Sequence, residues 1–320
     1  MRTPYRLRAA LLRTAAVAAT ATLALAGCSQ AGSDGADDAQ PGVSPEAGAS
    51  FPVTVGDVTL DERPEKIVSL SPTLTEMLFA IDAGDQVTAV DDNSNHPAEA
   101  PITDLSGFTP NVEAIVTYEP DLVVLSTDAN GVVAGLNRLS IPVYLADAAV
   151  TLDDTYRQIT ELGALTGHPD AAADLVDGMR TEIDKLVADA PELAEPLTYY
   201  YELDPTFYTV TSQTFVGSLF AMVGLTNVAD AADPQGEAGG YPQLSAEALI
   251  DADPDLIFLA DTKCCAQDAQ TVAARAGWST ITAVQAGQVV ELDDDIASRW
   301  GPRVVDLVRA IVDAVDAATS

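Results

Sequence analysis

Two segments of the chain carry nearly the same thirteen-residue pattern. The first, EAIVTYEPDLVVL, begins at Glu113, and the second, EALIDADPDLIFL, begins at Glu247. Six of the thirteen positions are identical, and most of the others exchange one residue for a similar one. The apolar end of each copy follows a Pro-Asp pair and is typical of a buried strand. The chain therefore has to place two similar strands in two similar surroundings.

The repeat extends upstream of these segments. TEMLFAIDAGDQV (75–87) aligns with VGSLFAMVGLTNV (216–228), and both halves predict the order strand, helix, strand, loop, helix, strand. Continuous apolar strands that alternate with helices favour parallel sheets covered on both faces. We therefore expect an α/β fold with two related lobes, each a central, mostly parallel sheet flanked by helices. Two chance αβ units in a single domain are the alternative. The predicted strands are KIVSL, QVTAV and DLVVL in the first half and TYYYEL, LTNV and DLIFL in the second.

A helical stretch separates the two halves. Residues 153–165 form its first part, and Pro169 stands where a second helix begins. Apolar residues then recur at helical spacing from Leu175 to Val187. A helix from Pro169 to Ala190 is roughly 30 Å long at about 1.5 Å per residue. We expect one long inter-lobe helix that joins the lobes and restricts hinge motion.

The first residues of the chain predict export. Four arginines and no acid occupy residues 2–13, and an apolar run, Thr14–Ala26, follows. The run has the length of a signal-peptide core and is too short to cross a bilayer. It ends in LALAGCSQ, which resembles the bacterial lipobox, so Cys28 is the expected site of lipidation. A plain secretory signal with a chance cysteine is the alternative. More than one acyl chain on this residue gives stable anchoring.

Changes of composition along the chain predict five segments. Residues 29–50 are rich in Ala, Gly, Ser, Asp and Pro and cannot bury enough apolar surface to fold. The predicted segments are a lipoprotein signal peptide (1–27), a lipid-anchored disordered tether (28–50), an N-terminal α/β lobe (51–150), a helical connector (151–192) and a C-terminal α/β lobe (193–320).

The chain is strongly acidic. Its formal net charge is −34, and without the four arginines of residues 1–27 the remaining 11 basic residues oppose 49 acids. This charge disfavours nucleic acid and anionic membrane surfaces as partners, and its simplest explanation is solubility. The sequence has two histidines and shows no G-x-S-x-G motif or phosphate-binding glycine loop. An enzyme and a receptor for naked zinc or manganese are therefore disfavoured.

The ordered set of motifs is similar to that of one family. The lipobox, the acidic tether, EKIVSLSPTLTEMLFAI, the two repeated segments and SRWGPRVVDLVRAI follow one another along the chain. Over residues 64–315 they resemble the iron-siderophore/cobalamin family (class III, helical-backbone) of ABC-transporter solute-binding lipoproteins. The resemblance implies two lobes bridged by one long helix. It also implies that ligand binds between the lobes and is delivered to a permease dimer with a cytoplasmic ATPase.

The resemblance further implies a monomer anchored by lipid at the extracytoplasmic face of the membrane, with no catalytic activity and no cofactor of its own. The expected cargo is a metal chelate, a ferric siderophore first, with cobalamin or haem as alternatives. A ligand-sensing lipoprotein without transport and an uncharacterised extracellular enzyme are the other functions left open.

The same resemblance gives the repeated glutamates a role. In the family, one glutamate on each lobe docks into arginines of the permease, and Glu113 and Glu247 match those positions. Charge pairs of this kind set orientation more than affinity. The alternative is that each glutamate only stabilises a helix N-terminus.

Candidate ligand-binding residues lie in loops after the predicted strands, where open α/β sheets bind ligands. Tyr241 matches a position where related receptors place a ligand-stacking aromatic, and Phe108 lies one residue away from the equivalent position. Aromatic walls suit flat macrocycles and siderophore complexes, whereas packing within the loops is the alternative. Further aromatic candidates are Tyr208, Trp278 and Trp300.

Polar candidates lie in two of these loops. Thr73 and Glu76 have capping-box spacing, which predicts a helix N-terminus that faces the ligand. Related receptors place a ligand-contacting arginine at the position of Arg299, and a salt bridge to Asp293–Asp295 is the open alternative. Arg303 is expected to open the last helix in a structural role.

Two adjacent cysteines, Cys264 and Cys265, follow DLIFL. Thiols outside the cell tend to oxidise, so we expect a vicinal disulfide that forms a rigid apolar platform under the ligand. Intermolecular bridges and free thiols are the alternatives. The pair alone makes no zinc site, because such sites need four ligands.

Overall fold

The computed structural model describes residues 50–320. The predicted signal peptide, the lipidation site Cys28 and the tether up to residue 49 lie outside these residues. Among the helices that the structure describes, none has the length and apolar character needed to span a bilayer.

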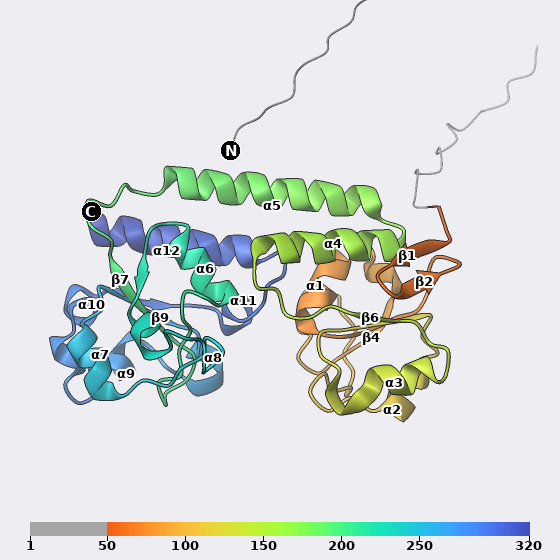
Figure 1. The fold of residues 1–320 in the computed structure, drawn as a ribbon, viewed down its shortest axis with the longest axis horizontal. Coiled ribbons are helices and arrows are strands. Elements are labelled where there is room, and N and C mark those ends of the chain that lie inside the picture. The colour runs from red at the N-terminus through yellow and green to blue at the C-terminus, as the bar shows by residue number, and fades with distance from the viewer. Residues whose placement is uncertain (1–49) are drawn as a thin grey trace, which may run out of the picture. The chain divides into compact units, whose positions relative to one another are not determined.

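The described chain forms two four-stranded sheets and a small hairpin (Figure 1). The strands are β1 (Val53–Val55), β2 (Val58–Leu60), β3 (Ile67–Leu70), β4 (Val87–Val90), β5 (Leu122–Leu125), β6 (Val143–Leu145), β7 (Thr198–Glu202), β8 (Thr226–Asn227), β9 (Leu256–Leu259) and β10 (Val289–Glu291). The strand order is β4-β3-β5-β6 in one sheet and β8-β7-β9-β10 in the other. All strand pairs within these two sheets are parallel.

The two sheets share one topology. The strands β3, β4, β5 and β6 occupy the same places as β7, β8, β9 and β10, so DLVVL and DLIFL form equivalent central strands. The two related α/β lobes predicted from the repeat are therefore confirmed. We call the parts built on the first and second sheets the N-terminal and C-terminal lobes.

Helices flank both sheets and connect them. The α-helices are α1 (Pro72–Ala80), α2 (Val112–Val116), α3 (Val132–Asn137), α4 (Leu152–Thr166), α5 (Pro169–Asp189), α6 (Phe215–Ala221), α7 (Ala246–Ala252), α8 (Thr262–Cys265), α9 (Ala269–Ala273), α10 (Thr282–Ala286), α11 (Asp294–Ala297) and α12 (Val304–Thr319). Short 3-10 turns are η1 (Gly84–Gln86), η2 (Ala129–Gly131), η3 (Val228–Ala232) and η4 (Trp278–Thr280).

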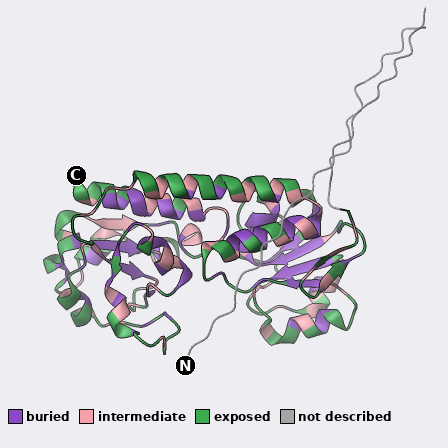
Figure 2. Cartoon of the chain, turned by 45° about the horizontal axis from the view of Figure 1, so that its top comes forward, coloured by how far each residue is buried: buried purple, intermediate pink, exposed green. Residues whose placement is uncertain are grey.

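Three long helices form a layer beside the two sheets (Figure 1). The helix α5 has 21 residues, about 30 Å at the usual rise per residue, and it contacts both α4 and α12. Its buried residues are confined to one stripe that includes Ala172, Met179 and Ile183, and the opposite face is exposed (Figure 2). The apolar spacing read from the sequence therefore produces the expected helix, which packs through one face only.

The largest core cluster passes through this helical layer and reaches both lobes. It includes Leu74 of the N-terminal lobe, Ile159 of α4, Val308 of α12 and Phe220 of the C-terminal lobe. Because apolar contact is continuous from one lobe to the other, burial itself holds the helices and lobes together.

Aromatic side chains fill the core of the C-terminal lobe. Tyr199, Tyr200 and Tyr201 of β7 are all buried, and Tyr200 packs edge-on against Trp278. Trp278 is 0% exposed, so the expectation that it lines a ligand site is wrong. Its large ring stabilises the lobe by burial instead.

Candidate ligand-binding site

Loops from the carboxyl ends of three N-terminal strands enclose a pocket of about 150 Å³. Phe108 is 79% exposed and forms part of its wall. Gly107 permits this position, because a Cβ there would lie 2.8 Å from Oδ2 of Asp91. Burial raises the pKa of Asp91 above its usual range. The lining residues are Leu70, Pro72, Asp91, Asn93, Gly107, Phe108, Ser126, Thr127 and Ala129.

Two tyrosines project from neighbouring loop segments of the C-terminal lobe. Tyr208 pairs with Gln243 in an isolated antiparallel bridge, and the next N–H, that of Thr209, donates to the carbonyl of Pro242 at 3.0 Å. Tyr208 is 43% exposed and Tyr241 is 50% exposed. The structure therefore brings the segments of these two candidate residues together after β7.

Asp233 holds the loop that carries Tyr241. Its carboxylate accepts hydrogen bonds from the N–H groups of Ala238 at 3.0 Å and Gly240 at 2.9 Å. The hydrogen bond from Ala238 is the main reason that the pKa of Asp233 is lowered. Gly240 has a φ of +87°, a conformation that suits glycine, so the turn before Tyr241 is fixed by its own sequence.

The predicted capping box at Thr73 and Glu76 does not form. The N-cap of α1 is Ser71, which makes no side-chain cap, and Pro72 begins the helix. Thr73 therefore lies inside the first turn and is 2% exposed, so it presents little surface to a ligand. The sequence pattern was misleading because a proline at the first helical position fixes the start of a helix by itself.

Arg299 joins the two lobes. Its Nη1 donates to Oε1 of Glu76 at 2.7 Å and to Oδ1 of Asn95 at 3.0 Å. Its Nη2 donates to the carbonyl of Asn93 at 3.1 Å and to Oδ1 of Asp295 at 2.7 Å. The side chain is 9% exposed. The salt-bridge alternative is thus the one that the geometry supports, and it extends across the lobes to a partner that the sequence did not suggest.

Glu76 receives a second guanidinium from Arg303. Nη2 of Arg303 lies 2.6 Å from Oε1 of Glu76, and its Nε lies 2.9 Å from Oε2. Arg303 is also the N-cap residue of α12, as its expected structural role requires. The Glu76 side chain is 2% exposed, so this buried carboxylate is compensated by two arginines from the other end of the chain.

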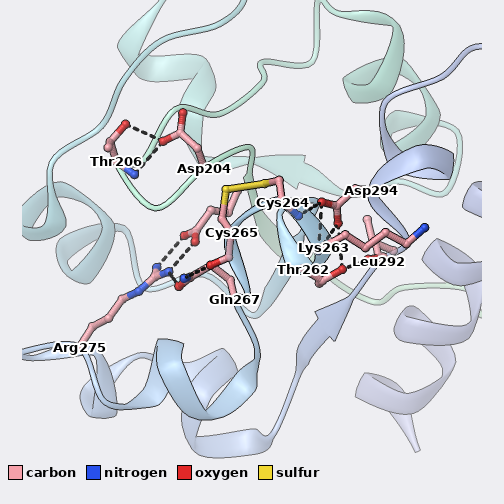
Figure 3. The surroundings of a disulfide bond; sticks show 11 residues. Asp204, Thr206, Thr262, Lys263, Cys264, Cys265, Gln267, Arg275, Leu292 and Asp294 are labelled. Atoms are coloured by element: carbon pink, nitrogen blue, oxygen red, sulfur yellow. Dashed lines mark hydrogen bonds and ion pairs between the residues drawn. A yellow bond between two sulfur atoms is a disulfide. The ribbon is translucent and has the colours of Figure 1, made fainter. Parts of the chain in front are cut away.

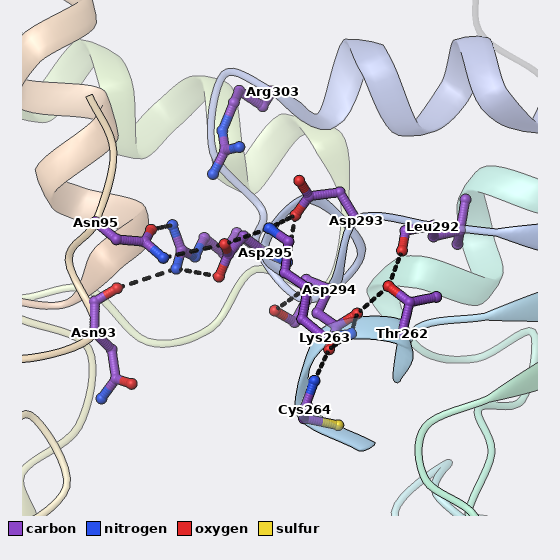
Figure 4. A network of polar contacts seen from close by, with 12 residues as sticks. Asn93, Asn95, Thr262, Lys263, Cys264, Leu292, Asp293, Asp294, Asp295 and Arg303 are labelled. Carbon is purple, nitrogen blue, oxygen red and sulfur yellow. Dashed lines mark hydrogen bonds and ion pairs between the residues drawn. The ribbon is translucent and has the colours of Figure 1, made fainter. Parts of the chain in front are cut away.

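Lys263 lies in a second polar cluster, which follows β9 and β10 (Figure 4). Its Nζ contacts Oδ1 of Asp293 at 2.6 Å and Oδ2 of Asp295 at 2.9 Å. Asn95 donates to the same Oδ2 of Asp295 at 3.1 Å. Asp295 therefore connects the loop after β4 with the loops of the C-terminal lobe.

The sulfur atoms of Cys264 and Cys265 are bonded to each other, and their Cα atoms lie 3.8 Å apart (Figure 3). The carboxylate of Asp294 accepts hydrogen bonds from the backbone N–H groups of Lys263 at 3.0 Å and Cys264 at 2.8 Å. It also accepts one from the hydroxyl of Thr262 at 2.8 Å. A side chain from the loop after β10 thus fixes the short helix that carries the disulfide.

A buried acidic pair lies at the ends of β7 and β9, and the sequence analysis missed it. Glu202 forms a two-point ion pair with Arg275, with N–O distances of 2.6 and 2.5 Å. Asp261 is 0% exposed, and neither of its carboxylate oxygens has a hydrogen-bond partner within residues 50–320. Burial and the neighbouring Glu202 raise the pKa of Asp261 to about 7. An acid directly after an apolar strand was the available signal.

Trp300 is partly buried against the main core. Its indole N–H donates to Oε1 of Gln158 at 2.9 Å, and its carbonyl accepts from the hydroxyl of Thr155 at 2.9 Å. Both partners lie on α4, so Trp300 joins the loop before α12 to that helix. A contact between Trp300 and a ligand stays a prediction.

Glu113 and Glu247 occupy the same position on equivalent helices. Each is the second residue of its helix, α2 or α7, after a capping residue whose side chain accepts from the third N–H. The caps are Asn111 and Ser245. Both glutamates are exposed and make no side-chain hydrogen bond or ion pair with residues 50–320. In Figure 1 both helices lie on the side remote from α5.

Comparison with known proteins decides the family. The family model described as periplasmic binding protein matches residues 67–296. The chain belongs to the periplasmic binding protein family. This periplasmic binding protein is 29% identical over 310 residues to YvrC of Bacillus subtilis, an uncharacterized ABC transporter substrate-binding lipoprotein. The match covers 92% of this chain and 95% of YvrC.

Two further relatives of the periplasmic binding protein are named for the ligand that they bind. A cobalamin-binding protein of Halobacterium salinarum is 31% identical over 279 residues, which cover 83% of this chain and 74% of that protein. The crystal structure of the vitamin B12-binding protein BtuF of Vibrio cholerae superposes with a TM-score of 0.68 at 26% identity, over 80% of this chain and 98% of that one. These relatives are named as binding proteins, which supports a binding role for this chain.

Proposed function

We propose that this protein captures a metal chelate between its two lobes outside the cytoplasmic membrane, anchored through Cys28, and delivers it to an ABC permease. Exposed aromatic side chains at the carboxyl ends of two equivalent sheets carry the proposal. Phe108 stands on one lobe, and Tyr208 and Tyr241 stand on the other. Broad aromatic surfaces of this kind bind large, flat or apolar ligands.

A corrinoid is the ligand that the relatives favour. Both the Halobacterium protein and BtuF are named for cobalamin or vitamin B12. The ferric siderophore expected first from the sequence, and haem, are the competing ligands, because all three fit an aromatic site. Fluorescence titration of the purified protein with cyanocobalamin, ferric siderophores and haem separates them. Absence of quenching by every probe contradicts the proposal.

The aromatic residues supply the first test. We expect Phe108→Ala and Tyr241→Ala each to weaken binding of the preferred ligand about tenfold, ~1.4 kcal/mol, because stacking area is lost. Ile102→Ala is the matched control, since Ile102 is an apolar side chain with 101% exposure that does not line the pocket of Phe108. Unchanged dissociation constants for both aromatic variants, measured by titration, rule out this site.

The glutamate pair supplies the second test. We propose that Glu113 and Glu247 dock into basic pockets of the permease, because they are exposed and equivalent in the two lobes. The variants Glu113→Lys and Glu247→Lys should abolish ligand uptake by cells and leave the dissociation constant of the ligand unchanged. Asp251→Lys, on the same helix as Glu247, is the control. Normal uptake by the double variant contradicts the docking role of the two glutamates.

A further inference from the structure

The cations near the candidate site are few. The loops that follow the strands of both sheets, residues 91–95, 107–108, 126–129, 203–208, 239–241, 261–268 and 293–300, contain two basic residues, Lys263 and Arg299. An anionic ligand is normally held by arginine or lysine side chains that can form charge-assisted hydrogen bonds. The state of these two side chains therefore bears on which ligands the site accepts.

Both cations are already neutralised by carboxylates of the protein. Lys263 lies 2.6 Å from Asp293 and 2.9 Å from Asp295. Arg299 lies 2.7 Å from both Glu76 and Asp295, and its remaining Nη contacts go to amide and backbone oxygens. A ligand anion can recruit Arg299 only by displacing one of these acids, and at Lys263 it meets an ammonium whose charge two carboxylates already offset.

The groups behind the loops add no positive charge. Arg303 is paired with Glu76, and Arg275 is paired with Glu202. The cluster of Lys263, Arg299 and Arg303 faces Glu76, Asp293, Asp294 and Asp295, so three cations meet four carboxylates.

The start of α1 does not replace a basic side chain. Its first residue is Pro72, which has no N–H to donate, and Thr73 is 2% exposed. The pocket beside it is lined by Asp91 and Phe108 and by no basic residue. Asp92 and Asp128 in the adjoining loops are exposed acids, so the surface offered to a ligand is aromatic and acidic.

We infer that the ligand of this site is a neutral or cationic chelate, and that chelates with exposed carboxylate or catecholate charge are rejected. This inference rests on the proposed function and narrows its ligand class. Like charges repel most strongly where water is partly excluded, so the protein's own acids act as a filter against anionic cargo.

Two matched ligand series test the inference with the full-length protein purified in detergent. The first series is ferrioxamine B (+1), its N-acetyl derivative (neutral) and its N-succinyl derivative (−1), which share one iron-binding core. The second is cyanocobalamin and its monocarboxylic acid derivative. In whichever series binds, we expect the anionic member to bind at least about tenfold more weakly. Raising the salt concentration should narrow that gap.

The outcomes separate the inference from the proposed function. If the anionic member binds as tightly as the neutral one, or if only haem or a ferric tricatecholate binds, the charge filter is wrong while chelate capture stands. If no chelate binds, the proposed function fails and the filter fails with it. Asp92→Lys should improve binding of the anionic member, because Asp92 is an exposed acid beside the pocket residue Asp91. Asp57→Lys, in the β1–β2 turn, should not.

Discussion

Single residues at the carboxyl ends of the strands carry most of the unusual chemistry of this protein. Asp261 is buried without a hydrogen-bond partner in the described chain and faces the Glu202–Arg275 ion pair. A buried carboxyl group in such surroundings favours its protonated form. Between the pKa of Asp261 in the unfolded chain and its higher pKa in the folded protein, the folded protein therefore holds a proton on Asp261 that the unfolded chain releases.

This proton predicts a pH dependence of stability. The pKa of Asp261 is about 7 in the folded protein and about 4 in an unfolded chain. Because the folded value is the higher one, Asp261 makes wild type lose stability as pH rises from about 4 to about 7, by up to ~1.4 kcal/mol per pH unit. Asp261→Asn removes this loss. The free energy of unfolding of the variant, relative to that of wild type, should therefore rise between pH 5 and 7 and stay constant above pH 7.

Urea unfolding of both proteins at pH 5, 6, 7 and 8 measures the difference. Asp57→Asn, an exposed turn residue, should track wild type at every pH. A constant difference between Asp261→Asn and wild type across this range contradicts the assignment of the proton to Asp261.

The contacts of individual side chains were harder to predict from the sequence than the strands and helices. The sequence and its family resemblance placed Phe108, Tyr208 and Tyr241 in loops, and the structure exposes all three, while their contact with a ligand stays a prediction. The partners of Arg299 on the N-terminal lobe were not predicted. Glu76 and Asn95 lie far from Arg299 in the sequence, and nothing in a linear sequence specifies that contact.

At the scale of elements, the strands followed from the sequence. Apolar runs such as DLVVL and DLIFL have few alternatives to a buried parallel strand, and the repeat fixed their equivalence. Helix ends were harder to predict. The start of α1 depends on Pro72, whereas the short helix α8 depends on Asp294, about thirty residues further along the chain.

The dependence of α8 on Asp294 gives a prediction. Asp294→Ala removes the acceptor for the N–H groups of Lys263 and Cys264 at the start of α8. Loss of a capping side chain costs about 1 kcal/mol, so hydrogen exchange at these two amides should accelerate roughly fivefold.

Asp313→Ala is the control, because Asp313 lies on the exposed face of α12. Mass-spectrometric hydrogen exchange should show the acceleration in residues 262–265 alone. Unchanged exchange in this segment argues that the disulfide, and not Asp294, fixes the loop.

At the scale of the whole molecule, an apolar and an ionic connection are the main links between the lobes within residues 50–320. One is the apolar core that passes through α4, α5 and α12. The other is the buried ion cluster of Glu76, Arg299 and Arg303. The connecting helices were predicted from their periodicity, while the ion cluster was not.

Glu76→Gln tests how much this cluster contributes to the free energy of unfolding. Removing the carboxylate leaves Arg303 without its counter-charge and Arg299 with Asp295 alone, and both guanidinium groups are largely buried, which should cost roughly 3–5 kcal/mol of unfolding free energy. Glu119→Gln breaks a surface ion pair with Lys66 and should leave the unfolding midpoint unchanged within error. Equal midpoints for the two variants in urea show that the cluster adds nothing to stability.

The position of Glu76 in the chain also has a consequence for biosynthesis. Its counter-charges, Arg299 and Arg303, belong to the last part of the chain to be made. An N-terminal lobe that forms before the rest of the chain therefore buries a carboxylate whose partners are still missing. A chain that ends before Arg299 keeps the strands of both sheets but leaves Glu76 without both arginines, so its N-terminal lobe should be less stable than in the full chain.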